Sequence, residues 1–168
     1  MNFQDNFAYH IKDEYFRLVQ DDKLMSNKEA GSYRPTFICI QDPKTNLLWA
    51  IPMSTRVEKY QNIVEKQIER YGECLSIVIG KYDGKQSAFL LQNMFPITKN
   101  YIAHVHTRKN NPVPVNYSIR MQVLKKFSKL LQLHKLGKKV VFPDIDRLVK
   151  IMIEKDTKER NKDNDLSR

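Results

Sequence analysis

The sequence lacks the features of several specialised classes of protein. Only 5 glycines and 7 prolines occur among 168 residues, which excludes collagen-like and low-complexity chains. No apolar run approaches the ~20 residues that cross a bilayer, and residues 1–10 show no basic segment followed by an apolar one, so we expect no secretory signal. The two cysteines, Cys39 and Cys74, lie in apolar runs without C-x-x-C spacing and are expected to be reduced and buried. Together these absences and the length predict one cytoplasmic domain.

Acidic residues are absent from one long block of the chain. Residues 84–143, here called the acid-free block, contain no Asp or Glu and carry 11 of the 29 Lys and Arg residues. The remaining chain has 18 basic and 19 acidic residues, so the block accounts for the net charge of +10. Clustered Lys and Arg bind phosphate backbones strongly because binding releases counterions, so a polyanion is the expected partner. The alternative is a basic face that is only solvated and has no partner. A membrane surface is not favoured as the partner, because neither end of the sequence shows a basic amphipathic anchor.

The apolar pattern predicts an α+β fold of short strands and a few helices. Strand-forming runs separated by turn residues occur at residues 7–11, 36–41, 47–52, 74–80, 86–91, 94–97 and 101–106. Three- and four-residue spacing predicts helices at residues 12–19, 56–71, 117–136 and 144–154, with loops at 21–32 and 110–115. Asp83-Gly84 is a strong signal for a hairpin turn between the runs 74–80 and 86–91. Hairpin turns recur and helical crossovers are few, which favours a compact, strongly curved antiparallel barrel over a layered βαβ sheet. We expect residues 1–155 to form one domain and the charged residues 156–168 to form a frayed tail.

Two of the predicted helices carry more detailed expectations. Thr55 and Glu58 fit a capping box, in which Thr55 is the N-cap of the helix 56–71 and Gly72 ends it. In the long basic helix 117–136, spacing assigns the core-facing positions to Tyr117, Met121, Leu124, Phe127 and Leu131.

The segment 52–56 is the strongest candidate site because a strand there runs into a helix. Backbone amides converge at a helix N-terminus and bind phosphate, and Ser54, Thr55 and Arg56 add two hydroxyls and a guanidinium. An N-cap hydroxyl is normally occupied by a helix amide, so Ser54 is freer than Thr55 to contact a ligand. Arg34 precedes Pro35 before the next strand and either projects beside the barrel mouth or is an exposed charge.

Acid–base and metal chemistry are less well defined by the sequence. His104 and His106 share a strand face, but no third ligand stands at useful spacing, so we expect no metal site and no cofactor. The general acid and base stay open, with His10, Lys12 and Tyr15 as candidates. Tyr9 and Tyr15, at the first strand-to-helix junction, have a structural alternative as core tyrosines with bonded hydroxyls. Phosphate-binding glycine motifs and a two-metal carboxylate cluster are absent, so cleavage of RNA by this chain would proceed without metal.

Several segments, taken in order, resemble one known family. An aromatic strand and helix come first (Phe7-Ala8-Tyr9-His10-Ile11 through Tyr15), and Arg34-Pro35 precedes the strand Thr36-Phe37-Ile38-Cys39-Ile40. Ala50-Ile51-Pro52-Met53-Ser54-Thr55, Asn93-Met94-Phe95-Pro96-Ile97 and the helix 117–136 follow. This order resembles the toxins of type III toxin–antitoxin systems, the ToxN, AbiQ and CptN group, with the CptN-like sequences most similar.

The resemblance implies a fold and an activity. Members of that family have a Kid/MazF-like, SH3-like barrel with added helices, and they cut RNA without metal, leaving 2′,3′-cyclic phosphate and 5′-hydroxyl ends. Their antitoxin is a pseudoknot RNA that the toxin itself processes and that inhibits the toxin, and the systems act in phage defence. The family's paired hydroxyls map to Ser54 and Thr55, and its site tyrosine maps to Tyr15.

Two departures from the family pattern concern lysines. The family often has a Lys before the central strand and another two places after the hydroxyl pair, whereas this chain has Pro35 and Val57 there. Arg34 and Arg56 stand next to those positions and can stabilise charge, but a guanidinium is too basic to accept a proton.

RNA is therefore the expected partner, as substrate and as inhibitor in a toxin–RNA hetero-oligomer. The residues expected to contact it are aromatic or basic: Tyr9, Lys12, Tyr33, Lys85, Arg108, Lys109, Arg120, Lys125, Lys126 and Lys129. A non-catalytic binder of single-stranded RNA or DNA and a toxin that acts by binding a host protein are the alternatives.

Overall fold

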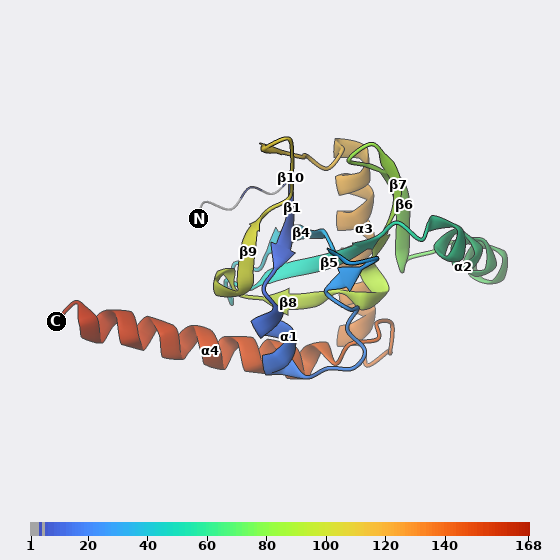
Figure 1. The fold of residues 1–168 in the computed structure, drawn as a ribbon. Helices are drawn as coiled ribbons and strands as arrows, with labels where there is room; N and C mark the ends of the chain where they lie inside the picture. Colours follow the sequence, from blue (N-terminus) through green and yellow to red (C-terminus); the bar gives the residue numbers. More distant parts are fainter. Residues whose placement is uncertain (1–3, 5) are drawn as a thin grey trace.

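The computed structural model describes residue 4 and residues 6–168, and its main body is one antiparallel sheet (Figure 1). The strand order is β6-β7-β5-β4-β1-β9, and β8 pairs with β5. The strands are β1 (Ala8–Ile11), β4 (Thr36–Gln41), β5 (Leu48–Ser54), β6 (Ile77–Tyr82), β7 (Lys85–Leu90), β8 (Phe95–Ile97) and β9 (Ile102–Val105). Two small hairpins lie outside the sheet: β2 (Lys28–Glu29) with β3 (Ser32–Tyr33), and β10 (Thr107–Arg108) with β11 (Asn111–Pro112).

Four α-helices and two short 3₁₀ turns surround the sheet. They are α1 (Asp13–Val19), α2 (Val57–Tyr71), η1 (Leu91–Asn93), η2 (Lys99–Tyr101), α3 (Tyr117–Lys135) and α4 (Ile145–Leu166). In Figure 1, α3 stands behind the sheet, α2 projects from the side of β6 and β7, and the C-terminal turns of α4 extend away from the body. None of the helices in the described part of the chain combines the length and apolar character needed to cross a membrane.

The central strand β5 brings together the segments that form the candidate site. All seven of its residues are buried, and β4 pairs along one edge. Its other edge is shared, because Leu48 to Ala50 pair with β8 whereas Met53 and Ser54 pair with β7. The end of β5 therefore lies between the start of β4 and the β6–β7 hairpin.

The α+β class and the antiparallel sheet are confirmed. Among the described residues, no pairing joins β6 to β9, so these two strands are the ends of an open series. Closure into an SH3-like barrel stays a prediction. Cys39 and Cys74 are free and buried as expected, and burial raises the pKa of the Cys39 thiol.

The core face of α3 is shifted from the predicted one near the start of the helix. Phe127 is buried as predicted, and Leu124 and Leu131 are partly buried against the core. Ile119, Val123 and Leu130 are also buried, whereas Tyr117 is 70% exposed and Met121 is 44% exposed. Gly80 on β6 explains the shift, because a Cβ built there would come within 2.5 Å of the Ile119 side chain. The helix packs on the sheet where the missing side chain leaves room, and apolar spacing alone does not reveal that site.

Several local predictions also need correction. The predicted loop 21–32 contains the β2–β3 hairpin, whose turn residues Ala30 and Gly31 have φ of 51° and 82°, as tight hairpin turns require. A second hairpin, formed by residues 107–112, begins before the predicted loop 110–115 and ends within it. The last helix does not end at Glu154 but continues to Leu166 through the predicted tail. That its exposed turns fray stays a prediction.

The two ends of α2 differ in how well they were predicted. Gly72 ends the helix in the left-handed region, with φ of 79°, and its N–H donates to the Ile68 carbonyl, as expected. The capping box is wrong, because the N-cap is Arg56 and no side chain caps the helix there. The Thr55 hydroxyl is engaged elsewhere, by a residue distant in sequence.

Candidate active site

A pocket of about 270 Å³ opens where β5 ends. Four segments line it: the β2–β3 hairpin with the residues leading into β4, the end of β5, the β6–β7 hairpin, and the residue that follows β9. Their side chains include Glu29, Arg34, Ser54, Thr55, Tyr82, Asp83, Lys85 and His106.

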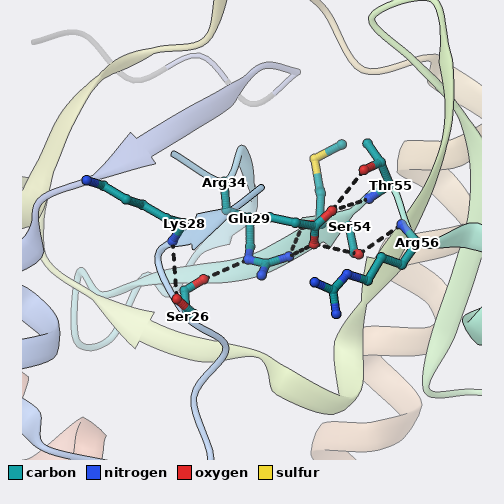
Figure 2. A network of polar contacts seen from close by, with 8 residues as sticks. Ser26, Lys28, Glu29, Arg34, Ser54, Thr55 and Arg56 are labelled. Atoms are coloured by element: carbon teal, nitrogen blue, oxygen red, sulfur yellow. Dashed lines mark hydrogen bonds and ion pairs between the residues drawn. The ribbon is translucent and has the colours of Figure 1, made fainter. Parts of the chain in front are cut away.

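Glu29 is the centre of the polar contacts in this pocket (Figure 2). Its Oε2 accepts hydrogen bonds from the Ser54 hydroxyl at 2.7 Å and from Arg34 Nη1 at 2.6 Å. Its Oε1 accepts from both the backbone N–H and the hydroxyl of Thr55, at 2.9 and 2.8 Å. Four donors from two distant segments therefore converge on one carboxylate, and we call these residues the Glu29 cluster.

Arg34 is a buried member of the Glu29 cluster. It is only 6% exposed, so its interpretation as an exposed solubilising charge is wrong. Its Nε donates to the Ser26 carbonyl at 2.8 Å, and its Nη1 also donates to the Met53 carbonyl at 2.8 Å. The guanidinium thus links the hairpin to the end of β5 in a fixed orientation.

The cluster holds Glu29 in its charged form. Burial of the carboxyl would raise its pKa, but the hydrogen bonds from Ser54, Thr55 and Arg34 outweigh burial and lower the pKa from 4.5 to about 2. Hydroxyls, backbone amides and a guanidinium are also the groups that bind phosphate oxygens. The arrangement therefore holds one anionic group, the chain's own Glu29 carboxylate.

Ser54, the last residue of β5, is buried, whereas Arg56, two residues later, is exposed. Ser54 is 2% exposed, and its Oγ accepts a hydrogen bond from the Arg56 backbone N–H at 3.1 Å while it donates to Glu29. Arg56 itself is exposed and does not line the pocket. In Figure 2 its side chain runs below Ser54 and makes no drawn side-chain contact with Glu29.

A second set of polar side chains in and next to the pocket centres on His106. His106 Nε2 lies 3.0 Å from Asp83 Oδ2, and His106 Nδ1 lies 2.8 Å from His10 Nε2. The Tyr82 hydroxyl donates to the Val113 carbonyl at 2.9 Å, and burial raises the Tyr82 pKa. Arg108 Nη1 lies 3.4 Å from the other oxygen of Asp83.

The structure does not bring the predicted N-terminal residues to the pocket. Tyr15 is fully buried, its hydroxyl donates to the Pro96 carbonyl at 2.9 Å, and burial raises its pKa. Tyr9 is buried with its hydroxyl bonded to the Gln4 backbone. Lys12 is exposed before α1 and does not line the pocket. Both tyrosines thus have the structural role that was the alternative for them.

The predicted RNA-binding residues fall into two groups. Near the pocket, Lys85 and Tyr33 line it, Arg108 pairs with Asp83, and Lys109 follows Arg108 in the β10–β11 turn. Tyr33 also donates from its hydroxyl to Asp13 at 2.9 Å.

The other group lies on α3. Lys125, Lys126 and Lys129 line a separate hollow of about 190 Å³. Lys126 Nζ donates to the Ile77 carbonyl at 3.2 Å, and burial lowers its pKa. Lys129 lies 3.5 Å from Glu73, and the Arg120 guanidinium lies over the Tyr117 ring. The acid-free block therefore contributes to two surfaces rather than one.

Three residues of the pocket were missed as site residues. Glu29 lies in a segment predicted to be a loop, although Ala30-Gly31 is a turn signal that could have placed it on a hairpin. Asp83 was read only as part of the Asp83-Gly84 turn, and His106 only as half of a metal-binding pair. Their chemistry becomes visible when contacts over 23 to 96 residues are known.

A comparison with solved structures supports the fold. No protein-family model and no curated protein matches the chain. A solved structure of AbiQ, a lactococcal anti-phage endoribonuclease belonging to the type III toxin–antitoxin system, is similar, with a TM-score of 0.65 over 86% of this chain and 94% of that chain. At 13% identity, this similarity shows a shared fold, in line with the family resemblance of the sequence; the CptN-like subgroup stays a prediction.

Proposed function

We propose that this chain is a metal-independent endoribonuclease, the toxin of a type III toxin–antitoxin system. The observation that carries the proposal is the convergence of Arg34, Ser54 and Thr55 on one anionic group inside a pocket. The fold shared with an endoribonuclease supports it. Ser54 and Thr55 match the family's hydroxyl pair, and Arg34 stands next to the position of the family's Lys.

In the proposed reaction, an RNA phosphate takes the place of the Glu29 carboxylate among these donors. The ribose 2′-hydroxyl attacks its own 3′-phosphate, the 5′-oxygen leaves, and the products carry 2′,3′-cyclic phosphate and 5′-hydroxyl ends. Fixed donors stabilise the additional negative charge of the transition state because they need no reorientation. Ser54 is suited to this role because two hydrogen bonds and burial hold its hydroxyl in place.

The biological setting follows from the same proposal. The protein acts in phage defence in the cytoplasm, binds a pseudoknot RNA antitoxin that it cuts from a precursor, and forms a hetero-oligomer with that RNA. The basic residues near the pocket and on α3 supply two surfaces for the RNA backbone.

Cleavage of mixed RNA in the presence of EDTA tests the activity. We expect new 5′-hydroxyl and 2′,3′-cyclic phosphate ends. Thr55→Val, which removes one hydroxyl from an exposed position at nearly constant shape, is expected to lower the cleavage rate about 10-fold. Contaminating ribonuclease would act equally in both preparations, so equal rates would contradict the proposal. Binding of RNA without any cleavage by the wild type would favour the non-catalytic binder.

The salt dependence of RNA binding tests the basic surface near the pocket. Lys85→Gln is expected to weaken binding similarly for RNAs of different sequence and to reduce the slope of log K against log [salt] by about 1, because one phosphate contact is lost. The matched control is Lys66→Gln on the exposed face of α2, outside the acid-free block, which should leave the slope unchanged. A flat salt dependence for the wild type would rule out binding dominated by phosphate contacts.

A further inference from the structure

A chain of hydrogen bonds joins one carboxylate and two imidazoles beside the Glu29 cluster. Asp83 stands in the β6–β7 turn, where its φ is 49°, His106 follows β9, and His10 belongs to β1. Asp83 Oδ2 is 3.0 Å from His106 Nε2, and His106 Nδ1 is 2.8 Å from His10 Nε2. The ring of His104 stacks on that of His10, with the centroids 4.8 Å apart. Asp83 and His106 line the pocket.

The partners of His106 determine where its protons lie. An ionised carboxylate only accepts hydrogen bonds, so the proton of neutral His106 is assigned to Nε2, facing Asp83. His106 Nδ1 then accepts from His10 Nε2–H, which leaves His10 Nδ1 as a buried nitrogen without a hydrogen bond among the described atoms. Because the imidazoles bond one another, they do not form a ligand set: the described residues contain no group of three or more side chains arranged to hold a metal ion.

Of the two bonded imidazoles, His106 is the one that contacts a carboxylate. Burial, together with the neighbouring His106 and His104, lowers the pKa of His10 to about 4, so His10 stays neutral near pH 7. His106 has the Asp83 carboxylate beside it, which can balance an imidazolium charge. When His106 carries that charge, its Nδ1–H donates to His10 Nε2, and neutral His10 holds its own proton on Nδ1. The network therefore places on the wall of the pocket an imidazole that can donate a proton from Nε2.

The proposed cleavage requires a proton donor that the Glu29 cluster does not contain. The departing 5′-oxygen would leave as an unstable alkoxide unless it is protonated. Glu29 is ionised because its hydrogen bonds, working against burial, lower its pKa to about 2, and a guanidinium such as that of Arg34 does not release its proton. The Tyr82 hydroxyl is bound to the Val113 carbonyl. Imidazole is the side chain that ordinarily changes charge near neutral pH.

We infer that His106 is the general acid of the cleavage reaction and that Asp83 and His10 position it. This inference rests on the proposed function. The O2′–P bond forms as the P–O5′ bond breaks, the 2′-hydroxyl proton passes to solvent water, and the Nε2 proton of the His106 imidazolium passes to O5′. Neutral His106 then regains a proton from water. When Nε2–H turns from Asp83 to the substrate, Arg108 remains beside the other oxygen of Asp83 and balances its charge.

The test compares two leaving groups at the same cleavage position. On ordinary RNA, His106→Gln is expected to lower the cleavage rate by about 10²–10³-fold, the usual contribution of a general acid. In the second RNA, sulfur replaces the 5′-oxygen at the mapped position, and a thiolate leaves without needing a proton. On that RNA the variant is expected to cleave within about threefold of the wild type, whereas Ser54→Ala should be impaired on both RNAs.

Matched variants separate proton donation from structural support. His134→Gln is the control, because His134 makes a similar 2.8 Å contact with Asp146 outside the pocket and should leave both rates unchanged. Asp83→Asn keeps a residue that tolerates positive φ. It should slow cleavage of ordinary RNA about 10-fold, with no further loss in the His106→Gln background and with recovery on the sulfur-containing RNA.

The possible results distinguish failure of the inference about His106 from failure of the proposed endoribonuclease function. Wild-type cleavage together with equally fast His106→Gln cleavage would overturn the inference and leave the proposed function intact. Equal impairment of His106→Gln on both RNAs would make His106 a structural residue and overturn its role as an acid. A wild type that cuts neither RNA would overturn the proposed function and the inference together.

Discussion

Glu29→Ala is expected to lower the free energy of unfolding by about 3 kcal/mol and the Tm by roughly 6–12 °C. The change leaves the guanidinium of Arg34, which is 6% exposed, without its carboxylate partner. It also removes the acceptor for the Ser54 hydroxyl and for both donors of Thr55. Most of the cost comes from Arg34 and Ser54, which are buried, because water does not readily replace the acceptor that they lose. Thermal and denaturant unfolding measure the effect.

Two variants check that the loss comes from the cluster. Glu65→Ala, on the exposed face of α2, should change the free energy of unfolding by less than about 0.5 kcal/mol. The double variant Glu29→Ala/Arg34→Met removes the buried charge with its partner and should recover part of the loss. If Glu29→Ala were as stable as Glu65→Ala, the cluster would not stabilise the fold.

The dependence of stability on acidic pH is a second test of the hydrogen bonds that Glu29 accepts. Although burial raises the pKa of Glu29, the hydrogen bonds of Ser54, Thr55 and Arg34 lower it from 4.5 to about 2. A lowered pKa contributes stability that is complete above the unfolded value and disappears as the pH falls through the folded value. The wild type should therefore lose about 2 kcal/mol between pH 4.5 and pH 2 through this group, and Glu29→Gln should lose correspondingly less over that range.

Added anions should distinguish a binding site from a purely structural contact. In Glu29→Ala the donors of Arg34, Ser54 and Thr55 face the pocket without an anion. Inorganic phosphate is expected to raise the Tm of this variant more than that of the wild type, because binding to the folded state alone stabilises it. An equal rise in both proteins would contradict an exchange of phosphate for the carboxylate.

Ser54→Ala is expected to lower the single-turnover rate of RNA cleavage by about 10²–10³-fold, the usual cost of removing one fixed transition-state donor. The Ser54 hydroxyl is buried, accepts from the Arg56 amide at 3.1 Å and donates at 2.7 Å toward the anion position. Alanine removes the hydroxyl and leaves the strand pairing of Ser54 with Ala88 in place. Gel analysis of labelled RNA measures the rate.

The matched control for this variant is Ser76→Ala. Ser76 is 8% exposed, and its hydroxyl donates to Gln67 at 3.0 Å, outside the pocket. Its loss should cost stability of the same order, about 1 kcal/mol, without changing the cleavage rate. Full cleavage by Ser54→Ala, or equal loss in the two variants, would remove Ser54 from the proposed mechanism.

Local sequence signals predicted most of the sheet but only part of the site. The strand 36–41 matches β4, and the Asp83-Gly84 turn joins β6 to β7 as expected, because these features depend on neighbouring residues. The strand-to-helix junction at residues 52–56 predicted Ser54 and Thr55 as site residues, because such junctions bind phosphate. The position before Pro35 predicted Arg34, and the structure brings the three residues together. Tyr15 was selected by resemblance, and its buried contacts place it in the core.

Thr55 shows why local rules fail at this site. The spacing of Thr55 and Glu58 satisfies a capping box, yet both donors of Thr55 bond to Glu29, 26 residues earlier. In a capping box the Thr55 hydroxyl would accept from a helix amide, whereas here it donates to Glu29. An ionised acceptor makes a stronger hydrogen bond than a neutral one, so this distant carboxylate competes with the cap for the orientation of the side chain. No pattern within the segment 52–58 contains that competitor.

Local patterns in the sequence are enough to predict an α+β chain, an excess of basic residues in one acid-free block, and a segment at residues 52–56 that is rich in hydrogen-bond donors. The folded arrangement adds that Glu29 accepts from these donors and that Asp83, His106 and His10 form a hydrogen-bonded chain, of which Asp83 and His106 line the same pocket. Strand and helix propensities arise from neighbours along the chain, whereas these contacts arise from sheet register and hairpin placement across up to 96 residues.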